Sequence, residues 1–122
     1  FYNCTALESV TAPGVVEIGD EAFYGCGSMM KTDIFSSVEV IGNSAFYGCS
    51  GLTEVVLPET LSSMGESCFE NCTMLKRVVL DGTLQGISRY CFYGCRTLTD
   101  VVFQDSMTSL RLSSATTIPI LG

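Results

Sequence analysis

The pattern Phe-x-x-Cys recurs five times along this chain at nearly constant spacing. The copies begin at Phe1, Phe23, Phe46, Phe69 and Phe92, so the first step is 22 residues and each later step is 23. The shorter step places a missing residue between Pro13 and Val15, where a turn can lose one position. Self-similarity at a period of this length is typical of solenoids. We therefore expect stacked copies of one unit rather than a domain around a single central core.

Apolar residues keep their places within each unit. The third residue after each Cys is always Leu or Met, and the sixth is Val in every unit except the second, which has Thr32. One unit of 23 residues cannot bury these columns alone. Stacked coils can, because each apolar residue then lies on its equivalent in the next coil, about 4.8 Å away where strands pair.

Each unit is expected to contain one short strand and a helical turn. In Glu54-Val55-Val56-Leu57, alternation directs Val55 and Leu57 inward and the other two residues outward. Segments such as residues 19–26 are predicted to form short helical turns. The column that closes these turns holds only Gly or Asn, which indicates a left-handed backbone: Asn3, Gly25, Gly48, Asn71 and Gly94.

The full unit, L-x-x-V-x-L-P-x-x-L-x-x-I-G-x-x-A-F-x-x-C, resembles the BspA-like leucine-rich repeats. Residues 52–72 carry the pattern most clearly, and the resemblance covers about residues 1–110. It implies a right-handed leucine-rich-repeat solenoid, mostly β, with about five 23-residue coils and one short parallel strand per coil. It also implies protein–protein or surface interaction rather than catalysis.

Two parts of the chain depart from the repeat. In the second unit, residues 29–35 replace the usual Leu-Val-Leu-Pro type, which weakens the prediction of a strand there. Ala115 stands where a sixth Phe is due, so residues 111–122 are expected to be a C-terminal cap or tail. The chain opens at Phe1 in the middle of a unit, without Met or a visible signal peptide, and we expect a segment of a longer protein.

Five of the seven cysteines form one column of the repeat: Cys4, Cys26, Cys49, Cys72 and Cys95. We interpret them as small buried apolar groups. Disulfides between neighbouring coils are an alternative, which would leave one thiol over. A zinc site is another, formed by Cys68, Cys72, Cys91 and Cys95. Burial is favoured because Cys68 and Cys91 occupy the column that Ala22 and Ala45 fill in earlier units.

Composition excludes several functional classes. The chain has no His, which removes Ser-His and Cys-His nucleophile pairs and His-based metal sites. Its net charge of −7 argues against a nucleic-acid surface. No apolar run approaches the roughly 20 residues of a transmembrane helix. Since no catalytic motif is recognisable either, we expect a protein that is not an enzyme and uses no cofactor or metal.

The outward strand positions form two rows that are candidates for binding a partner. The first contains Ser9, Lys31, Glu54, Arg77 and Asp100, and the second contains Thr11, Asp33, Val56, Val79 and Val102. The eight members from units two to five are the predicted partner-binding residues. Three aligned valines would form an apolar stripe, which can mark an interface. The alternative is that Val is there for its strand propensity alone.

A tyrosine column and two glycosylation sequons are compatible with either an interaction module or a cell-surface protein. Tyr2, Tyr24, Tyr47 and Tyr93 share a column beside Phe and are expected to pack as a ladder. Asn3-Cys4-Thr5 and Asn71-Cys72-Thr73 match the glycosylation sequon, although Asn is also suited to the left-handed turn.

We therefore expect a non-catalytic protein–protein interaction module or structural scaffold. It would be an accessory subunit or a segment docked in a larger assembly, bound through the strand-lined face or the open ends. The alternative is a cell-surface adhesin or antigen repeat region. The sequence selects no compartment and no particular partner.

Overall fold

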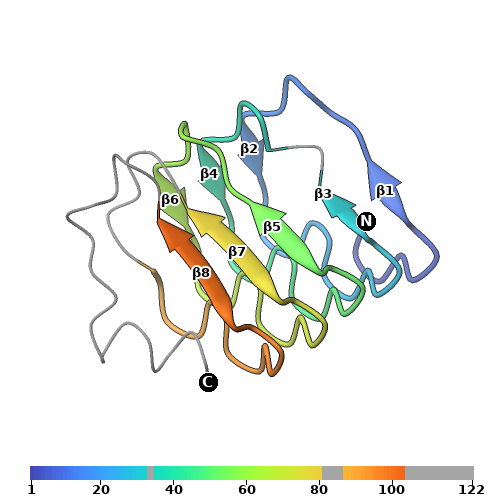
Figure 1. Cartoon of the computed structure of the whole chain (residues 1–122). Coiled ribbons are helices and arrows are strands. Elements are labelled where there is room, and N and C mark those ends of the chain that lie inside the picture. Colours follow the sequence, from blue (N-terminus) through green and yellow to red (C-terminus); the bar gives the residue numbers. More distant parts are fainter. Residues whose placement is uncertain (33–34, 81–86, 104–122) are drawn as a thin grey trace.

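The computed structural model describes residues 1–32, 35–80 and 87–103. It contains short strands arranged as successive turns of a solenoid (Figure 1). The strands are β1 (Ser9–Val10), β2 (Glu17–Ile18), β3 (Lys31–Thr32), β4 (Val40–Ile41), β5 (Glu54–Val56), β6 (Ser63–Met64), β7 (Arg77–Leu80) and β8 (Asp100–Phe103). All their pairings are parallel. The predicted leucine-rich-repeat solenoid is therefore confirmed, whereas the predicted cap at 111–122 lies outside the described residues.

Pairing register follows the sequence repeat. β5, β7 and β8 form one sheet in that order, and Glu54, Arg77 and Asp100 lie side by side in it, 23 positions apart in the sequence. Ser9 of β1 pairs with Lys31 of β3, which is 22 positions later. The step returns to 23 at β2 and β4, where Glu17 pairs with Val40. The missing residue thus lies between Val10 and Glu17, the interval that contains Pro13.

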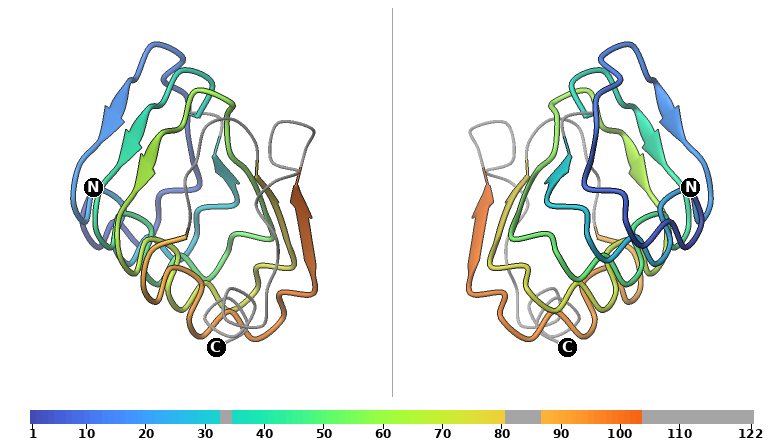
Figure 2. Two further views of the ribbon diagram at one scale, coloured as in Figure 1. Left: turned by 90° about the vertical axis from the view of Figure 1, so that its left-hand side faces the viewer. Right: turned by 90° about the vertical axis from the view of Figure 1, so that its right-hand side faces the viewer.

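The expectation of one strand per coil needs a correction, because the first three coils each contain two. The second strands, β2, β4 and β6, pair in that order in a sheet of their own. Figure 2 shows this sheet on one wall of the coil, with β7 and β8 on the opposite wall. These strands have only two residues each, and one of the two is buried in each case: Ile18, Ile41 or Met64. Two residues are too few for a period-two pattern to be recognisable.

The predicted helical turns also need a correction, because the described residues contain no helix. Residues 19–26 form successive tight turns, in which Ala22 N–H donates to Gly19 C=O and Cys26 N–H donates to Phe23 C=O. Glu21 between them has a φ of 56°, and a right-handed helix requires a negative φ. The backbone therefore reverses before a helix can propagate.

The column of Gly and Asn has the predicted left-handed backbone at all five positions. The φ angles are 57° at Asn3, 74° at Gly25, 70° at Gly48, 61° at Asn71 and 79° at Gly94. A second left-handed column was not predicted. It contains Glu21, Ser44, Ser67 and Tyr90, with φ angles between 54° and 59°.

The core is a stack of equivalent side chains between the two walls. Rings of Phe1, Phe23, Phe46, Phe69 and Phe92 stack face to face, with centroids 5.1–5.6 Å apart. Phe46 and Phe69, in the middle, are fully buried, and so is Val55. This stacking confirms that each unit is buried by its neighbours.

The cysteines are free thiols, and all except Cys4 are buried, which confirms the interpretation of the column as buried groups. In addition, the thiol of one coil donates to the Phe carbonyl of the preceding coil. Cys49 Sγ lies 3.1 Å from Phe23 O, and Cys95 Sγ lies 3.1 Å from Phe69 O. Each of these carbonyls also accepts the N–H of the Cys in its own turn. A thiol thus fits this column because it is small and can also donate a weak hydrogen bond.

Candidate partner-binding face

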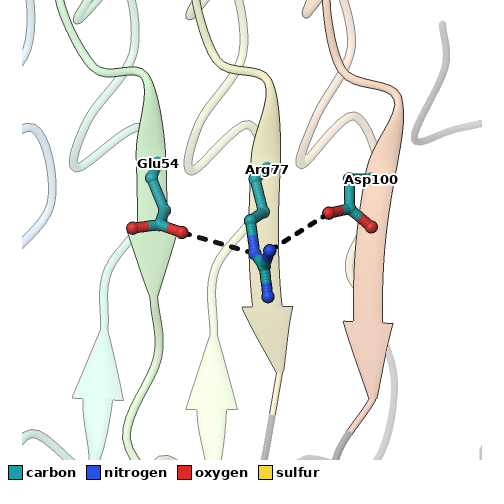
Figure 3. Close-up of polar contacts among 3 residues, drawn as sticks. All are labelled: Glu54, Arg77 and Asp100. Carbon is teal, nitrogen blue, oxygen red and sulfur yellow. Dashed lines mark ion pairs between the residues drawn. The ribbon is translucent and has the colours of Figure 1, made fainter.

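We call the outward side of β1, β3, β5, β7 and β8 the strand face. Lys31, Glu54, Arg77 and Asp100 are all exposed on it, as predicted. Arg77 lies between two carboxylates of the neighbouring coils, with Nε 3.3 Å from Glu54 and Nη1 3.4 Å from Asp100 (Figure 3). Each of the three side chains is about half exposed, so water screens these ion pairs and their net stabilisation is small. The row therefore contributes little to holding the fold.

The valine row is less uniform than its sequence suggests. Val56 is 51% exposed, Val102 is half-buried, and Val79 is only 5% exposed. Val79 nevertheless points away from the core, because Val78 and Leu80 on either side belong to the core cluster and Val79 does not. Its side chain is short and has an in-register neighbour on each side, Val56 and Val102. Alternation along the strand thus predicts correctly that these valines point outward. The exposed apolar surface is smaller than expected, because it consists of Val56 and part of Val102 only.

The strand face is interrupted between the second and third coils. β3 pairs with β1, and β5 pairs with β7, but among the described residues, which exclude 33 and 34, β3 and β5 show no pairing with each other. The interruption coincides with the second unit, where the sequence departs from the pattern. Asp33, a predicted partner-binding residue of this unit, lies outside the described residues.

One hollow lies at this interruption, and a second lies beside the segments that precede the strands. The first, of about 240 Å³, lies between the coils and is lined by Met30, Lys31, Thr32, Thr53, Glu54 and Val56. The other, of about 370 Å³, is lined by Glu8, Gly27, Ser28, Met30, Gly51 and Met74. Met30 is common to both. Of these residues, Lys31, Glu54 and Val56 were predicted as partner-binding. Met30 and Met74 were not, because the predicted rows contained strand positions only.

Three exposed apolar side chains surround these hollows. Met30 is 57% exposed, Val56 is 51% exposed and Met74 is 49% exposed. They come from three consecutive units, so the solenoid brings together residues that are far apart in sequence. Exposed apolar side chains gathered around a hollow are typical of an interaction surface.

Burial makes several of the thiols harder to ionise. Burial raises the pKa of Cys49 to about 12 and raises the pKa of Cys26, Cys68 and Cys72 as well. The pKa of Cys95 is lowered instead, because the Cys72 thiol donates a hydrogen bond to it. A thiol with a raised pKa is a poor nucleophile. Across the described residues, no cluster of three or more His, Cys, Asp or Glu is placed to hold a metal ion.

The tyrosine column forms the expected ladder over its first three members. The Tyr24 ring stacks between Tyr2 and Tyr47, with centroids 4.8 and 4.7 Å away. Glu70 follows in this column, and the Asn71 amide Nδ2 donates to the Tyr47 hydroxyl at 3.0 Å. Nδ2 is the atom to which a glycan would be attached, so in the second sequon this atom is engaged in a hydrogen bond. Tyr93 packs edge-on against Tyr90 instead.

Among the residues that the structure describes, no helix is long and apolar enough to cross a membrane.

Comparison with known families gives a match over nearly the whole chain. The model of the BspA type leucine rich repeat region matches residues 1–115, in six copies. Five copies of the Phe-x-x-Cys pattern are present in the sequence, and the end of the matched range lies outside the described residues. No curated protein matches the chain.

Solved structures of leucine-rich repeat proteins are similar to this chain. One from Bacteroides ovatus is 35% identical with a TM-score of 0.78, and the match covers 83% of this chain and 26% of that one. A leucine-rich repeat protein from T. pallidum is 29% identical with a TM-score of 0.79, covering 98% of this chain and 61% of that one. A leucine-rich cell surface protein from Faecalibacterium prausnitzii is 18% identical with a TM-score of 0.68, covering 92% and 34%. The chain thus spans less than two thirds of each of these proteins.

Proposed function

Because the chain belongs to the BspA-type leucine-rich repeat family, we propose that it is a non-catalytic protein-binding module that docks in a larger assembly through its strand face. Leucine-rich repeat proteins typically act as interaction or surface modules. The observation that carries the proposal is the group of exposed apolar side chains, Met30, Val56 and Met74, around the hollows of this face. A rigid stack presents such side chains at fixed spacing, which limits the ordering cost of binding.

The charged row would give the complex its orientation. Glu54, Arg77 and Asp100 alternate in sign across three coils and remain half exposed. Charges at the rim of an interface contribute to specificity and association rate more than to affinity. The lack of His in the sequence is in keeping with a role without acid–base catalysis at neutral pH.

The test is native fractionation of a lysate from the source, following this protein by mass spectrometry. We expect it to migrate with a much larger complex, and Val56→Glu to release it. Val16→Glu is the matched control, because Val16 is also exposed (48%) but precedes β2 on the other wall. Migration of the unaltered protein at its own mass, or equal release by both variants, would contradict docking through the strand face. Val79 is unsuitable for this test because it is buried.

A cell-surface role is the second candidate, because one solved protein of the same fold is described as a leucine-rich cell surface protein. That chain is only 18% identical, so the similarity supports a common fold, and a location at the cell surface is a proposal. Protease treatment of intact cells separates the two candidates. Digestion of the protein while cytoplasmic markers survive would favour the surface role, and protection would favour docking inside the cell.

A further inference from the structure

The hydrophobic pattern of the second unit is inverted at two neighbouring positions. The position before the strand is polar in the other four units (Glu8, Thr53, Lys76 and Thr99), but here it is Met30. The inward position two residues later is Val in the other units, but here it is Thr32. Met30 is exposed, and Thr32 is half-buried, as Val10 and Val101 are in the same column. This irregular unit coincides with the place where β3 and β5 show no pairing among the described residues.

Within the described residues, β3 and β5 are edge strands on either side of a hollow. β3 and β5 are each the last strand of their sheet on this side. An edge strand presents unpaired backbone N–H and C=O groups, which can hydrogen-bond to an extended segment of another chain. A local departure from the folding pattern that exposes a large apolar side chain is expected mainly at functional positions.

The size of the hollows indicates what kind of molecule fits. Volumes of about 240 and 370 Å³ are at or below the lower end of the range for small-molecule pockets. Met30 lines both hollows, and in the larger one it is joined by Met74 and by the small residues Gly27, Ser28 and Gly51. Methionine adapts its shape to different apolar partners. Such hollows are suited to single side chains of a protein segment lying across the surface.

The charges at the hollow between the coils favour an acidic group in the occupant. This hollow contains Lys31 and Glu54. Glu54 is paired with Arg77, which it shares with Asp100, whereas Lys31 has no ion pair within the described part of the chain. The second hollow contains Glu8, which favours a basic or neutral group at its far side. Met30 lies next to Lys31 in the chain, so an apolar contact and a charged contact are adjacent.

We propose that the break between β3 and β5 is a docking site for an extended segment of a partner protein, in which an apolar side chain lies beside a carboxylate. The apolar side chain packs between Met30 and Val56, and the carboxylate pairs with Lys31, which lines the same hollow. This inference rests on the proposed function and specifies the part of the strand face and the chemistry that would serve it.

The experiment is selection from a displayed library of random 12-residue peptides against the whole 122-residue chain. We expect selected peptides to combine a Leu, Met or Phe with a nearby Asp or Glu. Met30→Lys should weaken their binding roughly tenfold or more, the usual effect of losing a central apolar contact. Tyr93→Lys is the matched control, because Tyr93 is an exposed apolar residue outside the hollows, and it should leave binding unchanged.

Two further variants test the structural basis. Selection against Lys31→Glu should return peptides with Lys or Arg in place of the carboxylate. The double variant Met30→Thr with Thr32→Val restores the usual pattern, so it should fold at least as stably and should lose peptide binding. Circular dichroism of each variant verifies that the fold is retained.

The results that would refute this docking site differ from those that would refute the proposed function. Peptides that bind all variants equally would overturn the site while leaving a protein-binding module. Peptides without an acidic preference, or with one that Lys31→Glu does not reverse, would overturn the assigned chemistry. If no peptide is selected while Val56→Glu still releases the protein from a cellular complex, docking of an extended segment is wrong and the broader function stands.

Discussion

At the residue scale, the buried thiols link stability to alkaline pH. Burial raises the pKa of Cys49 from 9.0 to about 12 in the folded chain. Below pH 9 this thiol is protonated in both the folded and unfolded states, so it has no effect on the balance between them. As pH rises from 9 toward 12, the unfolded chain ionises and the folded chain does not, which favours unfolding. The free energy of unfolding should therefore fall by about 1 kcal/mol per pH unit in this range from this one thiol.

Urea unfolding at pH 8 and pH 10.5 measures this dependence. Cys26, Cys68 and Cys72 act in the same direction, so the whole protein should show a steeper decline than Cys49 alone would produce. Cys49→Ala is the control, and it should reduce the slope while lowering stability at both pH values. Identical slopes for the two proteins would show that Cys49 is not buried as described.

A second prediction at the residue scale concerns the phenylalanine stack. Phe69→Ala removes a fully buried ring that stacks on Phe46 and Phe92, so it should lower the free energy of unfolding by about 3–5 kcal/mol. Phe1→Ala is matched in chemistry, but Phe1 is 64% exposed and stacks on Phe23 alone. It should cost about 1 kcal/mol or less. Equal losses for the two variants in urea unfolding would refute the ladder as the core of the stack.

At the element scale, the residue type at the left-handed position of one turn restricts the residue type at the same position in the next coil. Asn71 Oδ1 lies where a Cβ on Gly94 would stand, and Asn3 Oδ1 has the same relation to Gly25. Gly48, by contrast, lies over Gly25, with the nearest atom 3.8 Å from its would-be Cβ. An Asn in this column therefore requires a Gly in the following coil, whereas a Gly does not.

This dependence predicts a coupling between two positions. Gly94→Ala should be strongly destabilising, because it combines a Cβ at a φ of 79° with the overlap on Asn71. In the Asn71→Gly background the overlap is gone, and about 1–2 kcal/mol of backbone strain should remain. Urea unfolding of the parent chain, both single variants and the double variant gives the coupling energy. Additive losses would contradict the packing of Asn71 against Gly94.

The turns also show why some features could be predicted and others could not. The column of Asn3, Gly25 and Gly48 was predictable because few residue types tolerate a positive φ. The column of Glu21, Ser44 and Ser67 has no such restriction in its residue types. Those residues are held in place by the next coil, since their N–H groups donate to Asn43, Glu66 and Arg89 carbonyls. Such contacts between coils leave no pattern within one unit.

The same distinction between features set within one unit and features set by neighbouring coils applies to the candidate site. The directions of Glu54, Val56 and Arg77 follow from alternation, which is local. The burial of Val79 depends on neighbouring strands, and each hollow is lined by residues from more than one coil. The sequence marked residues 29–35 as irregular but could not show that Met30 and Met74, from different units, share one hollow.

At the scale of the whole molecule, stability is distributed along a stack. Each inner coil packs on two neighbours, whereas the first coil of this chain packs on one. The burial of the ladder reflects this difference, from 64% exposure at Phe1 to 6% at Phe23 and 0% at Phe46. Since nearest-neighbour contacts supply most of the stability of repeat proteins, opening should begin at the first coil and progress inward.

Amide hydrogen exchange on the 122-residue chain tests this gradient. We expect residues 1–18 to exchange fastest, and the coils that contain Phe46 and Phe69 to exchange slowest. The contacts between coils supply a specific check, because Phe23 N–H donates to Ala45 and Phe46 N–H donates to Cys68. Protection at Phe46 should exceed protection at Phe23, although both amides make the same kind of bond. Equal protection at the two positions would mean that the stack opens as a single cooperative unit, and the nearest-neighbour account would then be wrong for this chain.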